Sequence, residues 1–372
     1  MKKTLLLVGL AAALGFNTAE AVDWNWKGDV RYRYESQLKD TKANDDEHSR
    51  DRHRMRVRLG VYPWINEELS GGVQISTGGN ETTSRNETFD DLFIPDQINL
   101  NEAFIDYHPM FLDGSVNLLL GKRDVAKTLI MTRDLVWDTD LTFEGATLQF
   151  GKDADGREKD GLNAVAGYYI LQEYATTSTG HDVPDAYLVA GQAAYTGEFS
   201  DLSYRLGASY YDYVHFDYTN PGGTYKPAFN YVGKDFNIVE VFGSIGGQVT
   251  ETLPWKVYGQ YACNTASHDD QVNIDEAKRD AYLVGLQIGD AKSPGQWSLD
   301  ANYVSIERDA VTVLTDSDRN AGAYTDLEGF KIGAVYHLVQ NMTVGATYFN
   351  FNKIDDDTTT NHLFQADVVV KF

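Results

Sequence analysis

The chain ends in the sequence LFQADVVVKF (residues 363–372), whose side chains alternate without a break between two faces. Successive side chains of a β-strand point to opposite sides, so one face of this segment is apolar and consists of Phe364, Ala366, Val368, Val370 and Phe372. The other face is largely polar. A soluble protein hides an apolar strand face in its core, whereas a chain that ends on such a strand after a secretion signal presents it to lipid. We therefore expect the last strand to face a membrane.

The N-terminus has the composition of a secretion signal. Two lysines follow Met1, residues 4–16 form a short apolar run, and an Ala-x-Ala cleavage site ends at Ala21. The apolar run is too short to span a bilayer, which takes about 20 residues. We therefore expect residues 1–21 to be a signal peptide, and residues 22–372 to be one membrane domain that is exported through the periplasm.

The mature sequence has no helix-length amphipathic segment and instead repeats a strand of about ten residues, the length that crosses a membrane in a barrel. Without membrane-spanning helices, a chain in lipid can pair all its backbone groups only in a closed β-barrel. Sixteen segments have the strand pattern, and an even number is typical of bacterial single-chain barrels. The predicted strands are 24–35, 53–62, 68–77, 98–107, 115–123, 142–151, 161–172, 185–196, 201–213, 235–247, 255–264, 279–289, 296–306, 328–338, 341–350 and 363–372.

The connections between these strands alternate in length. Long connections follow the odd-numbered strands, at 36–52, 78–97, 124–141, 173–184, 214–234, 265–278, 307–327 and 351–362. Short connections follow the even-numbered strands, at 63–67, 108–114, 152–160, 197–200, 248–254, 290–295 and 339–340. Outer-membrane barrels have short periplasmic turns and longer external loops, whereas a soluble sandwich does not sort its loops in this way. We therefore predict an all-β fold, a transmembrane barrel of sixteen antiparallel strands.

Composition agrees with this prediction. A formal net charge of −23 argues against nucleic-acid binding, and 23 Tyr, 17 Phe and 6 Trp are too many aromatic residues for a disordered chain. Aromatic rings favour strands in general, but they also form girdles at both membrane interfaces. The expected outward faces carry Trp24, Trp26, Tyr32, Tyr34, Trp255, Tyr261, Trp297 and Tyr303. The single cysteine, Cys263, shares one of these faces, so we expect it to face lipid and to be inert.

The first two strands carry a ladder of arginines. If Met55 and Val57 face lipid, then Arg54, Arg56 and Arg58 point into the lumen. A charge on the lipid face would cost roughly 2–4 kcal/mol near the midplane, which favours the same assignment. By the same alternation the first strand adds Arg31 and Arg33, and Arg123 extends the set. We predict that these six arginines form a basic wall along the pore.

The third long connection, residues 124–141, has an unusual composition for an external loop. It contains the apolar residues Leu129, Ile130, Met131, Leu135, Val136 and Trp137 among three aspartates. A water-exposed loop has little use for so many apolar residues, whereas a loop folded into the lumen packs them on the inner wall. Its carboxylates, Asp134, Asp138 and Asp140, would then face the arginines across a narrowed pore, where opposed charges create a transverse field.

With these features the chain resembles the bacterial outer-membrane porin family. The sixteen-strand plan, the inward third loop, the arginine wall and the terminal Phe372 are similar to that family, and so are the stretches NEAFIDY (101–107) and LLLGKR (118–123). The resemblance covers the mature chain. It implies passive diffusion of ions and small hydrophilic solutes through a water-filled pore, in a homotrimer in the bacterial outer membrane, in contact with lipid and lipopolysaccharide. This loop lacks the proline and glycine of a Pro-Glu-Phe-Gly-Gly-like turn that general porins often carry.

Several alternatives stay open at this point. The arginines could simply balance lumen carboxylates such as Glu102, Asp106 and Asp367. The acidic runs at 45–47, 269–270 and 355–357 could bind divalent cations that bridge lipopolysaccharide, or could be plain solvated surface. The barrel could also be a non-conducting adhesin or binding module that acts through its acidic external loops. We find no catalytic, cofactor or metal-binding motif, so we expect neither an enzyme, nor a cofactor, nor a bound metal.

Overall fold

The structure is a computed structural model, and it describes residues 22–41, 46–79, 81–153, 156–173, 184–216, 234–267, 275, 277–321, 323–355 and 359–372. The predicted signal peptide lies outside the described residues. The acidic run at 269–270 also lies outside them, as do parts of the runs at 45–47 and 355–357. In the described part of the chain, no helix is long and apolar enough to cross a membrane.

In these ranges the chain forms one closed antiparallel barrel of sixteen strands, which confirms the predicted fold. The strands of the ring are β1 (Asp23–Thr41), β2 (Asp46–Asn66), β3 (Leu69–Ser76), β5 (Asn99–Tyr107), β6 (Val116–Asp124), β7 (Thr142–Phe150), β8 (Gly161–Gln172), β9 (Ala186–Phe199), β10 (Leu202–Val214), β11 (Asn237–Thr250), β12 (Leu253–Asn264), β13 (Asp280–Gly289), β14 (Trp297–Ile306), β15 (Leu327–Val339), β16 (Met342–Lys353) and β17 (Thr359–Lys371). Each strand pairs with its neighbours along the chain. A two-residue strand, β4 (Glu87–Thr88), lies in the β3–β5 connection and pairs with β2.

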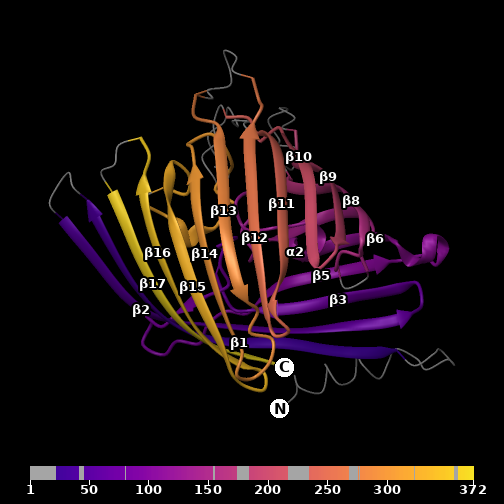
Figure 1. Cartoon of the computed structure of the whole chain (residues 1–372), viewed down its shortest axis with the longest axis horizontal. Helices are drawn as coiled ribbons and strands as arrows, with labels where there is room; N and C mark the ends of the chain where they lie inside the picture. Colours follow the sequence, from indigo (N-terminus) through magenta and orange to yellow (C-terminus); the bar gives the residue numbers. More distant parts are fainter. Residues whose placement is uncertain are drawn as a thin grey trace, which may run out of the picture.

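The barrel closes where the last strand meets the first. β17 pairs antiparallel with β1 from Lys371, opposite Asp29, to Thr359, opposite Thr41. The Gly28 and Phe372 backbones exchange hydrogen bonds of 2.8 and 3.0 Å beyond this ladder. A Cβ atom at residue 28 would lie 2.7 Å from the Phe372 ring, so glycine permits this close approach. The start of β1 and the end of β17 therefore lie at one end of the barrel, the end that carries the short turns (Figure 1).

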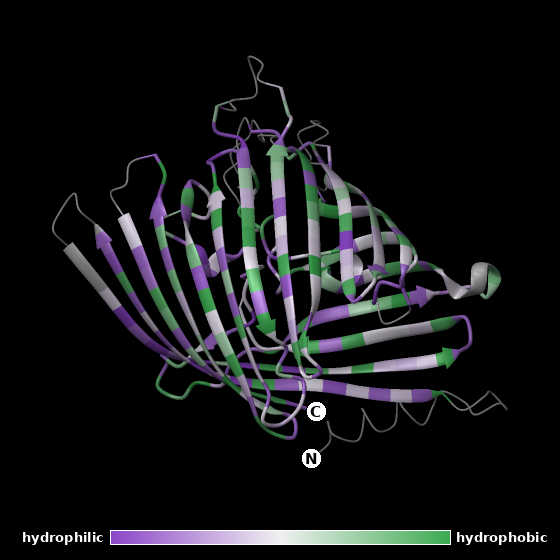
Figure 2. Ribbon diagram, viewed as in Figure 1, coloured by the Kyte–Doolittle hydropathy of each residue, from purple (hydrophilic) through white to green (hydrophobic). Residues whose placement is uncertain are grey.

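Side chains alternate between lipid and lumen around the ring, and the ribbon shows this as bands of hydrophobic and hydrophilic colour along the strands (Figure 2). On β17, Phe364 is 41% exposed on the outer face whereas Gln365 is 1% exposed on the inner face. Trp26 and Tyr32 of β1 also face outward, as the aromatic pattern predicts. Cys263 of β12 lies on the outer face and is partly buried.

The first hairpin differs from the expectation. Residues 36–52, predicted as a long external connection, belong mostly to strands, because β1 runs to Thr41 and β2 begins at Asp46. The ladder continues there through polar pairs such as Gln37 opposite Arg50. Sequence alternation fails as a boundary signal here, since a strand that rises above the membrane needs no apolar face.

Two external connections fold back into the lumen. The β6–β7 connection contains the short helix α2 (Val125–Thr128) and is here named the first inner loop, residues 125–141. The β14–β15 connection contains the 3-10 turn Ser317–Arg319 and is named the second inner loop, residues 307–326. Another 3-10 turn, Phe111–Gly114, lies between β5 and β6. The apolar core of the protein lies between the inner loops and the inner face of the barrel.

Candidate functional site

The first inner loop is anchored to the barrel by apolar contacts. Its Trp137 is 2% exposed and packs edge to face against Phe143 of β7, with ring centroids 4.9 Å apart, and against Tyr211 of β10 at 5.1 Å. Leu129 and Leu135 of the loop are fully buried in the same cluster. Burial of a large side chain of this kind contributes roughly 1.5–3 kcal/mol. The loop therefore covers the inner face of β7–β12 rather than standing in solvent.

Polar side chains of the wall fix the backbone of this loop. The side-chain oxygen of Gln192 accepts from the Ile130 N–H at 2.8 Å, and Lys152 donates to the Leu129 carbonyl at 2.6 Å. Arg205 donates to the Met131 carbonyl at 3.2 Å. These contacts satisfy backbone groups that would otherwise be buried without partners. The loop is consequently held by β9, β10 and the turn after β7.

The second inner loop packs on the first. The Asp138 N–H donates to the Leu314 carbonyl at 2.7 Å, and the Thr315 hydroxyl donates to the Leu135 carbonyl at 2.8 Å. Fully buried Arg319 forms an ion pair with Asp134. The two loops therefore form one body within the lumen.

The opposite wall of the lumen carries the arginines. The β1–β2 register sets Asp29 opposite Arg58, Arg31 opposite Arg56, Arg33 opposite Arg54 and Glu35 opposite Arg52. All of these side chains are on the inner face, since their neighbours in sequence are the outward-facing ones. The alternation on β2 thus sets the inward arginines of that strand about 6.7 Å apart along the strand.

The basic wall and the inner loops meet around a polar cavity of about 180 Å³. Six of the nine residues predicted from the sequence line this cavity: Arg31, Arg33, Arg56, Asp134, Asp138 and Asp140. Residues that the sequence reasoning missed complete the lining, notably Asp316 and Asp318 of the second inner loop, Lys331 of β15, and Ser84 and Asn86 of the β3–β5 connection. We call this cavity the constriction cavity.

Most wall arginines are paired with carboxylates. Arg33 binds both oxygens of Asp367 at 2.7 and 2.8 Å, in the fork geometry of a strong ion pair. Arg56 contacts Asp29 at 3.0 Å and Asp140 at 3.4 Å, so it joins the wall to the first inner loop.

Arg54 and Arg58 lie on either side of Arg56 along β2, and neither of them lines the constriction cavity. Arg58 lies 2.6 Å from Asp29 and 3.9 Å from Asp140, and Arg54 lies 3.7 Å from Glu35. Arg54 instead lines an outer cavity of about 450 Å³. Both arginines are therefore paired with inward carboxylates of β1, Arg58 with Asp29 and Arg54 with Glu35.

Arg123 lies elsewhere in the lumen. It is buried on β6, 3.4 Å from Asp106, and its guanidinium lies over the Phe104 ring. It lines a separate cavity of about 510 Å³ with Lys127. Arg123 is therefore not part of the β1–β2 wall, because its strand is separated from β2 by β3 and β5. Glu102, another carboxylate considered from the sequence, accepts hydrogen bonds from Tyr62 and from the Asp124 backbone instead.

The three aspartates of the first inner loop differ in their electrostatics. Burial alone would raise the pKa of Asp134, but Arg319 and Lys331 beside it lower that pKa well below its ordinary value. Burial and the neighbouring Asp316 raise the pKa of Asp138 to about 9, so this carboxyl is protonated at neutral pH. Asp140 lies 3.4 Å from Arg56. The loop therefore presents a carboxyl that is neutral at pH 7, Asp138, between two carboxyls that lie beside cationic side chains, Asp134 and Asp140.

The second inner loop could have been found from the sequence. Residues 310–314 read Ala-Val-Thr-Val-Leu, an apolar run in a long connection, which is the same signal that identified the first inner loop. Ala310 and Val311 are buried in the core cluster. The role of the β3–β5 connection has no comparable signal, because Ser84 and Asn86 are ordinary loop residues.

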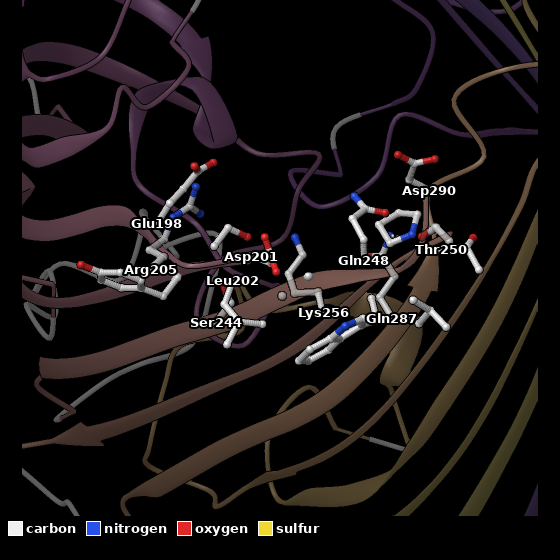
Figure 3. Close-up of a pocket in the computed structure, with 18 of the residues that line it drawn as sticks. Glu198, Asp201, Leu202, Arg205, Ser244, Gln248, Thr250, Lys256, Gln287 and Asp290 are labelled. Atoms are coloured by element: carbon white, nitrogen blue, oxygen red, sulfur yellow. Dashed lines mark hydrogen bonds between the residues drawn. The ribbon is translucent and has the colours of Figure 1, made fainter. Parts of the chain in front are cut away.

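Below the inner loops, at the end with the short turns, the lumen widens into a cavity of about 1010 Å³ along β9–β13. Its lining mixes both signs of charge, and Lys256 points into it between Asp201 and Gln248 (Figure 3). In Figure 3 Glu198 and Arg205 lie on one side of this cavity and Asp290 on the other. This composition suits a hydrated vestibule. In the described part of the chain no group of three or more His, Cys, Asp or Glu is placed to hold a metal ion.

Together these features set fixed charges of both signs around the constriction cavity. Solutes smaller than this cavity would meet guanidinium groups on one side and carboxylates on the other. Charges held at a constriction set ion preference in channels.

Comparison with solved structures places the fold among bacterial porins. Over 94% of both chains, the structure is similar to OprB of Pseudomonas putida at high pH, with a TM-score of 0.57 and 13% identity. It is also similar to an anion-selective porin from Comamonas acidovorans, with a TM-score of 0.54, 12% identity and coverage of 95% of this chain and 100% of that one. A mutant of the Rhodopseudomonas blastica porin gives a TM-score of 0.51 and 12% identity over 94% of this chain and all of that one. These likenesses establish the fold.

Sequence comparison establishes the family. Among curated proteins, none matches the chain. The family described as "Putative porin" matches residues 16–220 and 216–372, which together span nearly the whole sequence. The chain therefore belongs to this porin family, as the resemblance predicted, and it is a passive diffusion channel. Membership of this family points to a channel rather than to an enzyme.

Proposed function

We propose that this porin of the bacterial outer membrane passes ions and small hydrophilic solutes, and that it selects them at the constriction cavity. One observation carries the proposal: Arg31, Arg33 and Arg56 line the same cavity of about 180 Å³ as Asp134 and Asp140. These charges are held by the barrel wall and by a loop that is packed on the wall. A solute that crosses the lumen would therefore meet a fixed transverse field.

The sign of selection follows from which charges lie on the path. The acidic surface of the chain concentrates cations at the pore mouth, but salt at physiological strength screens charges beyond about 8 Å. Charges inside the constriction outweigh those at the mouth, and the wall there is basic. We therefore propose weak selectivity with a tilt toward anions.

The finer cellular assignments are part of the same proposal. Residues 1–21 would direct export through the periplasm and be removed, and residues 22–372 would insert next to lipid and lipopolysaccharide. The family resemblance supports a homotrimer. Nucleic acid is an implausible partner for a chain with a net charge of −23.

The test is planar-bilayer conductance of the detergent-purified protein under a KCl gradient. We expect stepwise insertion of conducting units and a reversal potential that reports weak anion preference. A protein that inserts but stays silent would overturn the proposal and favour the alternative, a closed barrel that works as an adhesin through its external loops. In that case the replacement of wall arginines would leave its binding unchanged.

A further inference from the structure

Four cationic side chains line the constriction cavity, and they are not equivalent. Arg33, Arg56 and Lys331 each lie within 4 Å of at least one carboxylate. Among the described residues, Arg31 forms no ion pair within 4 Å. Asp367 and Asp140 attract it only from beyond that distance. Arg31 is thus the one cation of this lining whose charge is not directly neutralised.

The hydrogen bonds of Arg31 are also incomplete. One terminal nitrogen donates to the side-chain oxygen of Asn86. Its Nε atom is buried and has no hydrogen-bond partner in the structure. Asn86 is held in place by Ser84, whose hydroxyl accepts from the Asn86 backbone and side chain at 3.3 Å. The guanidinium therefore has an unused donor at Nε, and it lines the cavity next to an ordered amide.

The ionised carboxylates of the cavity already form ion pairs with other cationic side chains. Asp140 lies beside Arg56, and Asp318 lies 3.5 Å from Arg33. Lys331 contacts both Asp134 and Asp316, at 3.3 and 3.1 Å. The remaining carboxyl, Asp138, has a pKa raised by burial and by Asp316, so it carries no charge at neutral pH.

We propose that Arg31 is the residue that binds a transiting oxyanion, a carboxylate or a phosphate, within the constriction cavity. The inference rests on the proposed function and adds a solute class and a specific residue to it. A guanidinium presents its N–H groups in a planar fork that matches two oxygens of such an anion. The hydroxyls of Ser84 and Thr139 line the same cavity and supply further donors. At about 30 Å³ per water, the cavity of about 180 Å³ holds roughly six waters, enough for a small oxyanion and part of its hydration shell.

The experiment measures block of single-channel chloride current by inorganic phosphate, with acetate as a second arm that separates phosphate from carboxylate preference. In the wild type, we expect added phosphate to reduce the current with a saturable dependence on concentration. In Arg31→Gln the half-blocking concentration should rise by about tenfold or more, the effect of losing one charge-assisted contact. Arg31→Lys keeps the charge but not the fork, so it should restore only part of the block.

A second variant tests the role of Arg31 through a substitution of its neighbour Asn86. Asn86→Asp has the same shape and sets a carboxylate against Arg31, which should neutralise Arg31 and weaken phosphate block as strongly as Arg31→Gln. The matched control is Gln37→Glu, an equally conservative change that also adds one negative charge. Gln37 lies on the same face of β1 as Arg31, about 20 Å from it along the strand. Phosphate block in this control should stay within about twofold of the wild type, because charges at that distance are screened.

The outcomes separate this inference from the proposed function. A channel that conducts but shows no saturable phosphate or acetate block, or the same block in wild type, Arg31→Gln and Asn86→Asp, overturns the inference and leaves the porin intact. An equal loss of block in Gln37→Glu and Asn86→Asp also overturns it, since the effect would then be one of net charge. A wild type that never conducts fails the proposed function itself.

Discussion

The lumen has two walls of opposite character. On β1 and β2 the inward positions are arginines and carboxylates that pair with one another across the ladder. On β8–β10 the inward positions include Leu188, Tyr211 and Tyr213, which are buried under the first inner loop. Both walls follow the same two-residue period, so the period alone does not distinguish them. What differs is whether the inner face is left to water.

The difference has a physical cause. An apolar inner face in a water-filled barrel must be covered, and the two inner loops supply the cover with their own apolar residues. A charged inner face is stable in contact with water and with paired charges, so no loop needs to pack over it. The constriction cavity consequently lies between the inner loops and the arginine wall. Its position is therefore a consequence of where the loops can pack.

The largest effect should come from removing the main anchor on the apolar wall. Trp137→Ala would cost about 3–5 kcal/mol of packing, as large core truncations do. The first inner loop would then loosen, and single-channel conductance in planar bilayers should rise well above the wild-type value. Such a result would show that packing on the apolar wall holds the first inner loop in place, since the charged wall is unchanged in this variant.

The control for this change is Trp297→Ala, which truncates the same residue type on the outer face of β14, where the side chain is 47% exposed. Conductance should be unchanged in this variant. If Trp137→Ala conducts like the wild type, packing on the apolar wall does not hold the constriction.

A smaller effect should follow from breaking the contact between the two inner loops. Arg319→Gln removes one partner of a buried ion pair, a change that typically costs 3–5 kcal/mol. Here Asp134 keeps Lys331 at 3.3 Å, so we expect a loss of about 3 kcal/mol or less in the docking of the second inner loop. Current recordings should show more frequent fluctuation between conductance levels. Arg319→Lys retains the charge, so its current should fluctuate less than that of Arg319→Gln. Equally steady currents in the wild type and both variants would show that Arg319 does not hold the two inner loops together.

The charge of Asp138 provides a test by pH. Its pKa is raised to about 9 by burial and by Asp316, so it is neutral at pH 7 and becomes negative as the pH rises through that value. Reversal potentials under a KCl gradient should therefore move toward cation preference between pH 7 and pH 10. Other groups also titrate in this range, so the comparison is with Asp138→Asn, which should lose part of the shift. An identical shift in the variant would mean that Asp138 does not change charge there.

The smallest effect is expected on the charged wall itself. Arg58→Gln removes an arginine that is partly exposed to water, and Asp29 keeps Arg56 at 3.0 Å. The loss of stability should be less than about 1 kcal/mol, measured by the temperature at which the folded band disappears on a gel. A loss as large as that of Trp137→Ala would remove the distinction between the two walls.

The barrel could be predicted from the sequence because lipid requires apolar side chains at every second position of the strands that cross it. The arginine face of β1 and β2 could be predicted for the same reason, since charges cannot face lipid. The prediction of a long connection at 36–52 was wrong, because strands that extend beyond the membrane lose that alternation while keeping their hydrogen bonds.

The site was predictable only in part. The apolar residues of the loop at 124–141 indicated that it folds inward. Residues 310–314 have the same apolar composition, but the inward fold of the second inner loop was not predicted from them. The pairing of each charge was not predictable. Whether Arg31 meets a carboxylate or Asn86 depends on how the β3–β5 connection is placed against β1, and nothing in the residue types fixes that placement.

The most direct test asks whether the constriction cavity is the narrowest part of the conducting path. Thr139 is exposed and lines this cavity, whereas Ser244 lines the wide vestibule below it. In a background in which Cys263 is replaced by alanine, Thr139→Cys and Ser244→Cys would each be modified by a bulky, water-soluble thiol reagent during bilayer recording. We expect modification at position 139 to cut the single-channel current severalfold and modification at position 244 to change the current little. Equal effects, or a larger effect at position 244, would contradict this expectation.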